Sequence, residues 1–309
     1  MTMHRRRFLG GAAALTLASF STPAAPAAAD NRGRWRPPRR VHISLTHSGW
    51  DMAPSGPLRE GATAFHTVTE DASGHYFSIL RMREGTTIER ALELLQASSD
   101  PDPEVALPAR RAFYREVEQN GGTAVYPGQQ AVFTKRFDPG VLYLGEAPAQ
   151  WVPDRPPFHV DPVEVADAGR SSCYMRSDVR LVADSAPEGV AIEASRTRFR
   201  SDAVICFSNR TGVPQELIFR RLLEDAGQQD VTEYYESVGA GDPLPSPFTE
   251  ERFGGMLPIS PGLAATLRVS GLPAARYCIV SHVKDPGTGL EQAVHGARRI
   301  VELSAPEGS

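Results

Sequence analysis

Cysteine, lysine and long apolar runs are all scarce in this sequence of 309 residues. The three cysteines, Cys173, Cys206 and Cys278, are too few for a disulfide-stabilised scaffold, and their spacing fits no zinc-binding pattern. A large hydrophobic core must therefore supply the stability of the chain. The only lysines are Lys135 and Lys284, and the abundance of arginine in their place reflects a compositional bias more than a function.

Motifs of the common catalytic classes are also missing. The sequence has no Gly-x-Ser-x-Gly elbow, phosphate-binding loop or His-Glu-x-x-His helix, and its eight histidines include no His-x-His pair. The segment 46–51 places His, Ser and Asp together, but a catalytic triad converges from separate segments, so a turn at the end of a strand is predicted. Glu70-Asp71 and Glu250-Glu251 are adjacent carboxylates whose side chains diverge, which favours solvated loops.

Residues 1–29 are typical of a twin-arginine signal peptide. Arg-Arg-Arg-Phe-Leu at 5–9 resembles the bacterial export signal, and the short apolar stretch Gly10–Phe20 follows it. Ala27-Ala28-Ala29 supplies the small residues that a signal peptidase requires before Asp30. We therefore expect cleavage after Ala29 and a secreted or extracytoplasmic protein. An uncleaved anchor is the alternative, which the short apolar core disfavours.

Charge and composition limit the partners. Loss of the arginines at 5–7 changes the formal net charge from −4 to −7, and an acidic chain argues against a nucleic-acid partner. Residues 30–40 are rich in arginine and proline and are predicted to be a linker, with a polyanion-binding arm as the alternative. No later segment has the length of a membrane-spanning helix, so no membrane span is expected after signal removal.

Short strands dominate the predicted secondary structure. Val41–Leu45 alternates apolar and polar residues, as a half-buried strand does. Apolar stripes at helical spacing predict helices over Thr87–Ala97, Ala109–Gln119 and Asp230–Val238. The other predicted strands are Ala64–Thr69, Tyr76–Met82, Ala131–Phe137, Val141–Gly145, Val179–Ala183, Ala203–Ser208, Leu217–Leu222, Ala264–Val269, Tyr277–Val283 and Arg298–Leu303.

The order of these elements occurs twice. Phe77–Met82 matches Leu217–Leu222, each a strand that leads into a helix, and the turns at 127–131 and 138–142 match those at 261–265 and 272–276. One repeat of this length indicates two homologous domains and not a solenoid. The predicted divisions are the domains 41–166 and 178–303, the linker 167–177 and the tail 304–309.

Segments of the second half resemble cupredoxin-like domains. Asn209–Glu216 resembles the loop after a middle strand in that family, where Asn-x-x-Gly precedes His-Glu. Pro261-Gly262, Tyr277–Ser281 and Asp285-Pro286-Gly287 resemble its closing segment, in which Gly-x-Tyr leads to a cysteine and a glycine-rich loop leads to Gly-Met. The resemblance extends more faintly to the first half. It implies an all-β fold of two tandem cupredoxin-like Greek-key β-sandwiches, each with short helical insertions.

The copper ligands of that family are degenerate here. A blue-copper site needs two imidazoles and a thiolate, with a weak axial thioether. The resemblance places the first histidine position at Gln215, the cysteine at Ser281, the second histidine at Gln292 and the methionine at Ala297. None of these side chains is a soft ligand, so the resemblance implies a scaffold without copper.

The first half keeps one histidine of the pattern. His75 stands at the first histidine position and Glu146 at the cysteine position, and the loop 147–160 does not reproduce the remaining spacing. His75 is interpreted as a loop histidine bonded to backbone. The alternative is a His75–Glu146–His159 cluster that would hold a borderline ion such as zinc.

Two further features have alternative interpretations. Trp151 and Phe158, in a proline-rich loop, either pin that loop to the core or form an aromatic binding lip; pinning is favoured because large aromatics mostly bury. Cys206 and Cys278 are expected on neighbouring strands, as buried packing residues or as a disulfide.

These observations favour an exported, non-catalytic binding protein on a copper-free cupredoxin-like scaffold, with an unknown ligand or protein partner held by loops at one end of a sandwich. No catalytic, cofactor-binding or metal-binding residue is assigned, and no cofactor is expected. One alternative is an extracytoplasmic metal-binding, copper-handling protein. The other is an enzyme with an unrecognised carboxylate site, since a fold does not fix a function.

Overall fold

The computed structural model describes residues 37–149, 158–168 and 176–306. The predicted signal peptide and most of the arginine-rich linker lie outside this part of the chain. The elements of the first half are β1 (Arg39–Thr46), β2 (Gly49–Ala53), β3 (Leu58–Arg59), β4 (Gly61–Thr69), β5 (His75–Met82), α1 (Ile88–Ala97), α2 (Pro103–Glu116), β6 (Val117–Val125), β7 (Gln130–Phe137), β8 (Gly140–Pro148) and β9 (His159–Ala166). Those of the second are β10 (Val179–Ala186), β11 (Gly189–Ala194), β12 (Arg198–Arg200), β13 (Ile205–Asn209), β14 (Gln215–Arg221), α3 (Gln228–Ala240), β15 (Gly255–Ile259), β16 (Ala264–Ser270), β17 (Ala275–Val280) and β18 (Arg298–Ser304).

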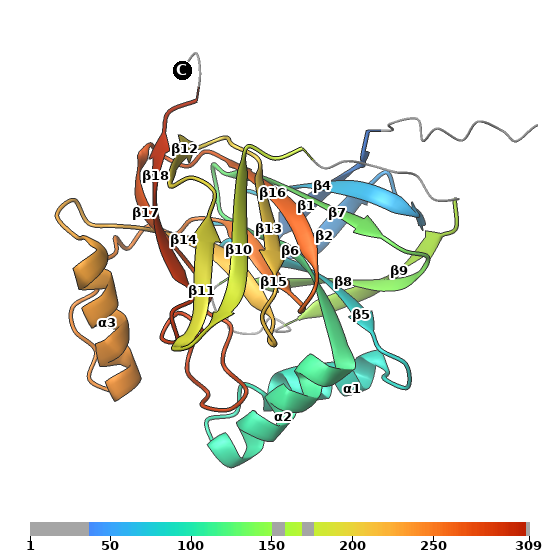
Figure 1. Cartoon of the computed structure of the whole chain (residues 1–309). Helices are drawn as coiled ribbons and strands as arrows, with labels where there is room; N and C mark the ends of the chain where they lie inside the picture. The colour runs from blue at the N-terminus through green and yellow to red at the C-terminus, as the bar shows by residue number, and fades with distance from the viewer. Residues whose placement is uncertain (1–36, 150–157, 169–175, 307–309) are drawn as a thin grey trace, which may run out of the picture. The chain divides into compact units, whose positions relative to one another are not determined.

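The strands form two sheets, and in both sheets the halves repeat the same pairings (Figure 1). The eight-stranded sheet has the order β11-β10-β13-β16-β7-β4-β1-β2, and the ten-stranded sheet has the order β12-β18-β17-β14-β15-β6-β5-β8-β9-β3. Each half contains one parallel pair in the first sheet, β1 with β4 and β10 with β13, which requires a crossover between them. The predicted all-β class, with short helical insertions in each half, is confirmed.

The halves meet edge to edge in both sheets. Strand β16 pairs antiparallel with β7, and β15 pairs antiparallel with β6. Each sheet therefore continues from one half into the other. One hydrophobic cluster, with members from both halves, fills the space between the two sheets. Whether the predicted domains 41–166 and 178–303 are separate folding units stays a prediction.

Glycine permits the close approach of the strands on either side of this junction. A Cβ atom on Gly255 of β15 would lie 2.1 Å from the carbonyl oxygen of Leu217 on β14. One on Gly122 of β6, where φ is +135°, would lie 1.9 Å from that of Phe77 on β5. Any larger residue at either position would push the strands apart, so these glycines allow β15 and β6 to complete the ten-stranded sheet.

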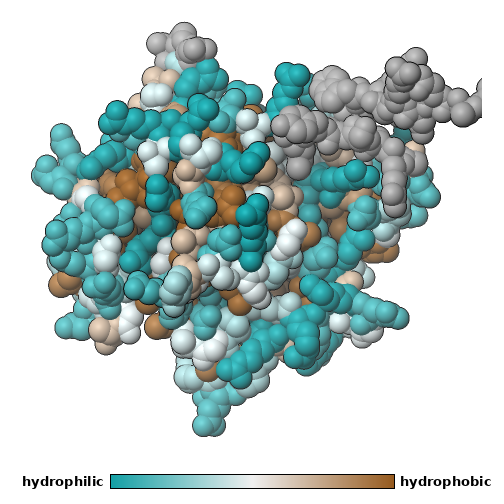
Figure 2. Space-filling view, viewed as in Figure 1, coloured by the Kyte–Doolittle hydropathy of each residue, from teal (hydrophilic) through white to brown (hydrophobic). Residues whose placement is uncertain are grey.

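The helices cover the outer face of the ten-stranded sheet in two separate places. Helices α1 and α2 pack on β5 and β6 through a cluster that includes Leu80, Leu94 and Phe113. Helix α3 packs on β14 and β17 through Val231 and Tyr235. Figure 1 shows α3 apart from the α1–α2 pair. On the face drawn in Figure 2, apolar side chains show only in patches among hydrophilic ones.

Helix α2 differs from its predicted bounds. It begins at Pro103, after Asp102, whose side chain accepts a hydrogen bond from the backbone N–H of Glu104 at 2.9 Å. It ends at Glu116, because Val117 begins β6. The sequence pattern predicts that this helix begins near Pro108, but Pro108 lies inside the helix. The pattern also extends the helix into β6, a strand that it does not predict.

The cysteine prediction is partly wrong. Cys206 lies on β13 in the eight-stranded sheet, whereas Cys278 lies on β17 in the ten-stranded sheet, so the two strands are not neighbours. Both thiols are free. Cys278 is fully buried and belongs to the cluster beneath α3, as expected for a packing residue.

Candidate functional site

A cavity of about 770 Å³ opens on the outer face of the ten-stranded sheet, and both halves line it. Tyr76 on β5 and Tyr126 after β6 come from the first half, and the second half supplies part of β14, the segment before β15 and a residue after β17. Its described lining residues are Tyr76, Tyr126, Glu216, Ile218, Phe219, Arg220, Thr249, Glu250, Glu251, Arg252, Phe253 and His282.

Strand alternation places Glu216 on this outer face. Along β14, Leu217 and Phe219 point into the core between the sheets, while Ile218 packs on the opposite side with the α3 cluster. Glu216 therefore faces outward, yet only 8% of its surface is exposed. The Oε1 atom of Glu216 accepts a hydrogen bond from the backbone N–H of His282 at 2.8 Å. Burial raises the pKa of this carboxyl to about 7, although the nearby charge of His282 opposes the rise.

The loop after β17 fixes His282 beside Glu216. The Nδ1 atom of His282 lies 2.7 Å from Oε2 of Glu291. Burial lowers the pKa of the imidazole, but the hydrogen bond and the charge of Glu291 outweigh burial, so the pKa is raised overall. Helix α2 of the first half holds the same loop, because the hydroxyl of Tyr114 donates to the carbonyl of Lys284 at 2.9 Å.

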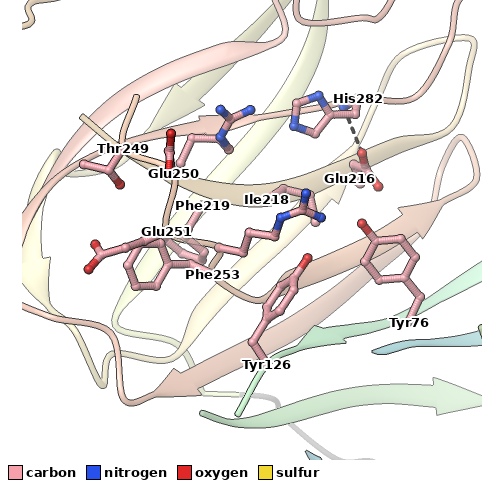
Figure 3. Close-up of a pocket in the computed structure, with 12 residues that line it drawn as sticks. Tyr76, Tyr126, Glu216, Ile218, Phe219, Thr249, Glu250, Glu251, Phe253 and His282 are labelled. Atoms are coloured by element: carbon pink, nitrogen blue, oxygen red, sulfur yellow. Dashed lines mark hydrogen bonds between the residues drawn. The ribbon is translucent and has the colours of Figure 1, made fainter. Parts of the chain in front are cut away.

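Two phenols complete the polar wall. Burial raises the pKa of Tyr76, and the nearby Tyr126 and Glu216 add to the rise. In Figure 3 both hydroxyls point into the cavity on the side of Glu216 and His282, while Glu250 and Thr249 lie across it. Protonated phenols can both donate and accept hydrogen bonds, so this wall suits a polar group of a ligand.

Arg220 and Arg252 both line the cavity but make different contacts. The guanidinium of Arg220 stacks over the ring of Phe248 at 4.5 Å. Arg252 is exposed and forms no ion pair with any residue that the structure describes, and its charge lowers the pKa of Tyr76. Of the rim carboxylates, Glu251 pairs with Arg221 at 2.9 Å. Neither Arg220 nor Arg252 forms an ion pair with a described residue, but Arg220 is stacked on Phe248 whereas the charge of Arg252 acts on Tyr76.

No family model and no curated protein match this chain. Among solved structures, it is similar to reduced auracyanin from Roseiflexus castenholzii, with 12% identity, a TM-score of 0.25, and coverage of 40% of this chain and 94% of that one. The multicopper oxidase McoA of Aquifex aeolicus has 12% identity, a TM-score of 0.25, and coverage of 86% and 65%. The copper-containing nitrite reductase of Thermus scotoductus has 14% identity, a TM-score of 0.23, and coverage of 87% and 63%. Such low scores transfer neither a metal nor an activity.

The four positions that the resemblance assigns to copper ligands, Gln215, Ser281, Gln292 and Ala297, lie in segments that the fold brings together. The backbone N–H of Ser281 donates to the carbonyl of Ala297, and that of Ala297 donates to the carbonyl of Gln292. The Oγ atom of Ser281 accepts from the backbone N–H of Glu216, next to Gln215. The side-chain nitrogen of Gln292 donates to Asp285, 3.1 Å away, so this amide holds the loop.

These donors do not fit a copper ion. Two amides, a hydroxyl and a methyl group include neither an imidazole nor a thiolate. Gln215 is fully buried, and neither polar atom of its side chain has a hydrogen-bond partner in the described part of the chain. The described residues also contain no group of three or more His, Cys, Asp or Glu side chains that could hold a metal.

The predicted cluster in the first half is only partly formed. His75 is fully buried, its Nδ1 atom contacts Glu146, and its Nε2 atom lies 3.2 Å from Asp71. The interpretation of His75 as a histidine bonded to backbone is therefore wrong, because both ring nitrogens face carboxylates. His159 is exposed and pairs with Asp161 at 3.0 Å. Its backbone lies opposite Glu146, but its side chain does not join the buried pair as a metal ligand.

Other sequence predictions have mixed outcomes. Residues Thr46 and Ser48 form the turn between β1 and β2, as predicted for the segment 46–51. Phe158 packs against the α1–α2 cluster, which agrees with the pinning interpretation; Trp151 lies outside the described residues. Glu250 and Glu251 are exposed, as predicted, yet both line the cavity.

Sequence reasoning misses the cavity itself. It identifies Glu216 only as the neighbour of a lost copper ligand, and it does not single out Tyr76 or Tyr126. The sequence carries no clear signal for it, because Glu216 stands in a strand, Gln215–Arg221, with three other polar residues.

Proposed function

We propose that this chain is an exported, non-catalytic binding protein that holds a small organic molecule in the cavity on the outer face of the ten-stranded sheet, on a copper-free cupredoxin-like scaffold. The observation that carries this proposal is Glu216, a carboxyl with only 8% of its surface exposed, which lines an open cavity. Its Oε1 atom accepts a hydrogen bond from the backbone N–H of His282, and no described residue is hydrogen-bonded to its Oε2 atom. A ligand group would satisfy it.

Binding is supported by the way the surrounding groups are held. The imidazole of His282 is hydrogen-bonded to Glu291, and the backbone N–H of His282 donates to Glu216. Groups that are fixed by protein partners in advance lose little freedom when a ligand arrives. No observation favours the copper-handling alternative, because the donor set at the old ligand positions does not suit copper.

The proposal is tested with a variant in which a large side chain fills the cavity. The mature protein is titrated with a library of small organic molecules, with thermal shift and then calorimetry as the measurements. Thr249→Trp should fill the cavity and abolish binding of every hit, whereas Thr197→Trp, at an exposed position that does not line it, should bind normally. Hits that bind Thr249→Trp as tightly as the natural protein would contradict the proposal.

An enzyme with a carboxylate site is the second candidate, and one observation favours it. The pKa of Glu216 near 7 is suited to general acid catalysis, and Glu250 lies in the same cavity. Incubation of each hit with the protein, followed by NMR, should show product formation that Glu216→Gln abolishes while binding persists. If every compound stays unchanged after long incubation, the enzyme candidate is contradicted and only the binding function is left.

A further inference from the structure

We propose that the ligand of this cavity is a small monocarboxylic acid whose carboxylate binds beside Arg252, Tyr76 and Tyr126. Glu216 stays protonated in the complex and donates a hydrogen bond to the ligand. This inference rests on the proposed function, because it assigns a chemical class to the ligand of the same cavity.

Arg252 supplies the charge that a carboxylate needs. Arg221 is bound to Glu251 at 2.9 Å, and Arg220 is stacked on Phe248 at 4.5 Å. Arg252 has no ionic partner in the described part of the chain. A guanidinium presents several donors in one plane, which matches the two oxygens of a carboxylate.

The phenols next to Arg252 add neutral donors. Tyr76 and Tyr126 both line the cavity, and each phenol has one O–H that can donate to a ligand. Burial raises the pKa of Tyr76, so this phenol stays protonated at neutral pH. A carboxylate only accepts hydrogen bonds, so it complements the donors of Tyr76, Tyr126 and Arg252.

Glu216 decides the protonation state of the complex. Its side chain is more than nine-tenths buried, and its neutral form can donate from the oxygen that lacks a protein partner. A ligand carboxylate placed there would disfavour ionisation of Glu216 further, because two adjacent negative charges repel. The titratable and charged groups around Glu216 are Tyr76 on β5, Tyr126 after β6, Tyr114 on α2, Arg252 before β15, and His282 and Glu291 after β17.

The remaining walls select a monoanion with an apolar body. Phe219, Phe253 and Ile218 form the apolar part of the lining, and about 770 Å³ is room for an aromatic or short aliphatic acid. Glu250 at the rim is an exposed carboxylate, which repels a dianion such as a phosphate ester more strongly than a monoanion.

The test compares acids with matched neutral and cationic compounds. Benzoate, phenylacetate and hexanoate, their amides and the corresponding amines are titrated by calorimetry at pH 6.0, 7.0 and 8.5. We expect at least one acid to bind about tenfold or more tightly than its amide and amine. Arg252→Gln should weaken that acid about tenfold to a hundredfold, as expected for loss of a charged hydrogen bond. Arg136→Gln, on the exposed face of the other sheet, should not change it.

The pH series separates a proton-donating role of Glu216 from a merely structural one. In the natural protein, affinity for the acid should fall about tenfold per pH unit above about pH 7, because Glu216 must bind a proton for the complex to form. Glu216→Gln keeps a donor that does not titrate, so its affinity should fall less steeply with pH, and what remains should come from His282 in the same cavity.

Two results would overturn the inference. The first is tighter binding of the amides or amines than of the acids, which would change the ligand class and leave the binding function standing. The second is an acid affinity with the same pH dependence in Glu216→Gln as in the natural protein. A different outcome would contradict the proposed function itself: no compound of the library binds, or Thr249→Trp blocks none of the compounds that do.

Discussion

Glu216→Gln should stabilise the protein at alkaline pH and leave its stability unchanged at acid pH. The carboxyl has an ordinary pKa of 4.5 and a pKa of about 7 in the folded protein, because burial disfavours its charge. The folded state therefore holds the proton more tightly than the unfolded state does. Stability from this group is fully present below pH 4.5 and is lost as the pH rises through 7. Glutamine has nearly the same shape and carries no charge, so it does not incur that loss.

The size of the effect follows from the pKa difference. A rise from 4.5 to about 7 corresponds to a free energy of unfolding lower by about 3 kcal/mol once Glu216 is ionised. The amide oxygen of the introduced glutamine can still accept the hydrogen bond from the backbone N–H of His282. We therefore expect the variant to exceed the natural protein by up to about 3 kcal/mol at pH 8, with the difference vanishing toward pH 4.5.

Urea unfolding followed by far-UV circular dichroism, at pH values between 4.5 and 8, measures both proteins. Glu250→Gln is the matched control, since Glu250 lines the same cavity but is exposed, and it should track the natural protein at every pH. A stability difference between Glu216→Gln and the natural protein that stays constant across this range would refute the reasoning. It would mean that burial does not hold the proton on Glu216.

Three further outcomes are expected. An Arg5→Lys, Arg6→Lys double variant should leave the precursor in the cytoplasm, detected by cell fractionation; normal secretion would point to the general secretory route instead. Cleavage at an engineered protease site between β9 and β10 should give two β-rich fragments that each melt cooperatively and associate when mixed, since β6, β7, β15 and β16 would present free edges; failure of both to fold would mean that the halves share one core. The mature protein should stay colourless with Cu(II), whereas a Gln215→His, Ser281→Cys, Gln292→His variant should gain an intense visible band; a band in the natural protein would show that the ligand positions are misassigned.

Local pattern was sufficient for much of the secondary structure. The alternation in Val41–Leu45 and the apolar stripe in Thr87–Ala97 correspond to β1 and α1, because burial on one face imposes a period of two on strands and 3.6 on helices. Strand β6 escaped prediction because Gly121 and Gly122 interrupt its pattern, and all but one of its residues are buried. A strand buried on both faces has no alternation to read.

The sequence by itself determined the all-β class and the order of elements that the two halves repeat. The repeat was readable because equivalent strands carry equivalent patterns. The candidate site was decided only by tertiary structure. Tyr76 and Glu216 are distant in sequence and share no motif, and each taken alone fits an ordinary strand. The antiparallel pairing of β15 with β6 brings their strands into one sheet, and α2 then holds the loop of His282 beside them. Such pairings depend on edge-to-edge contact between the halves, which no local pattern of residues records.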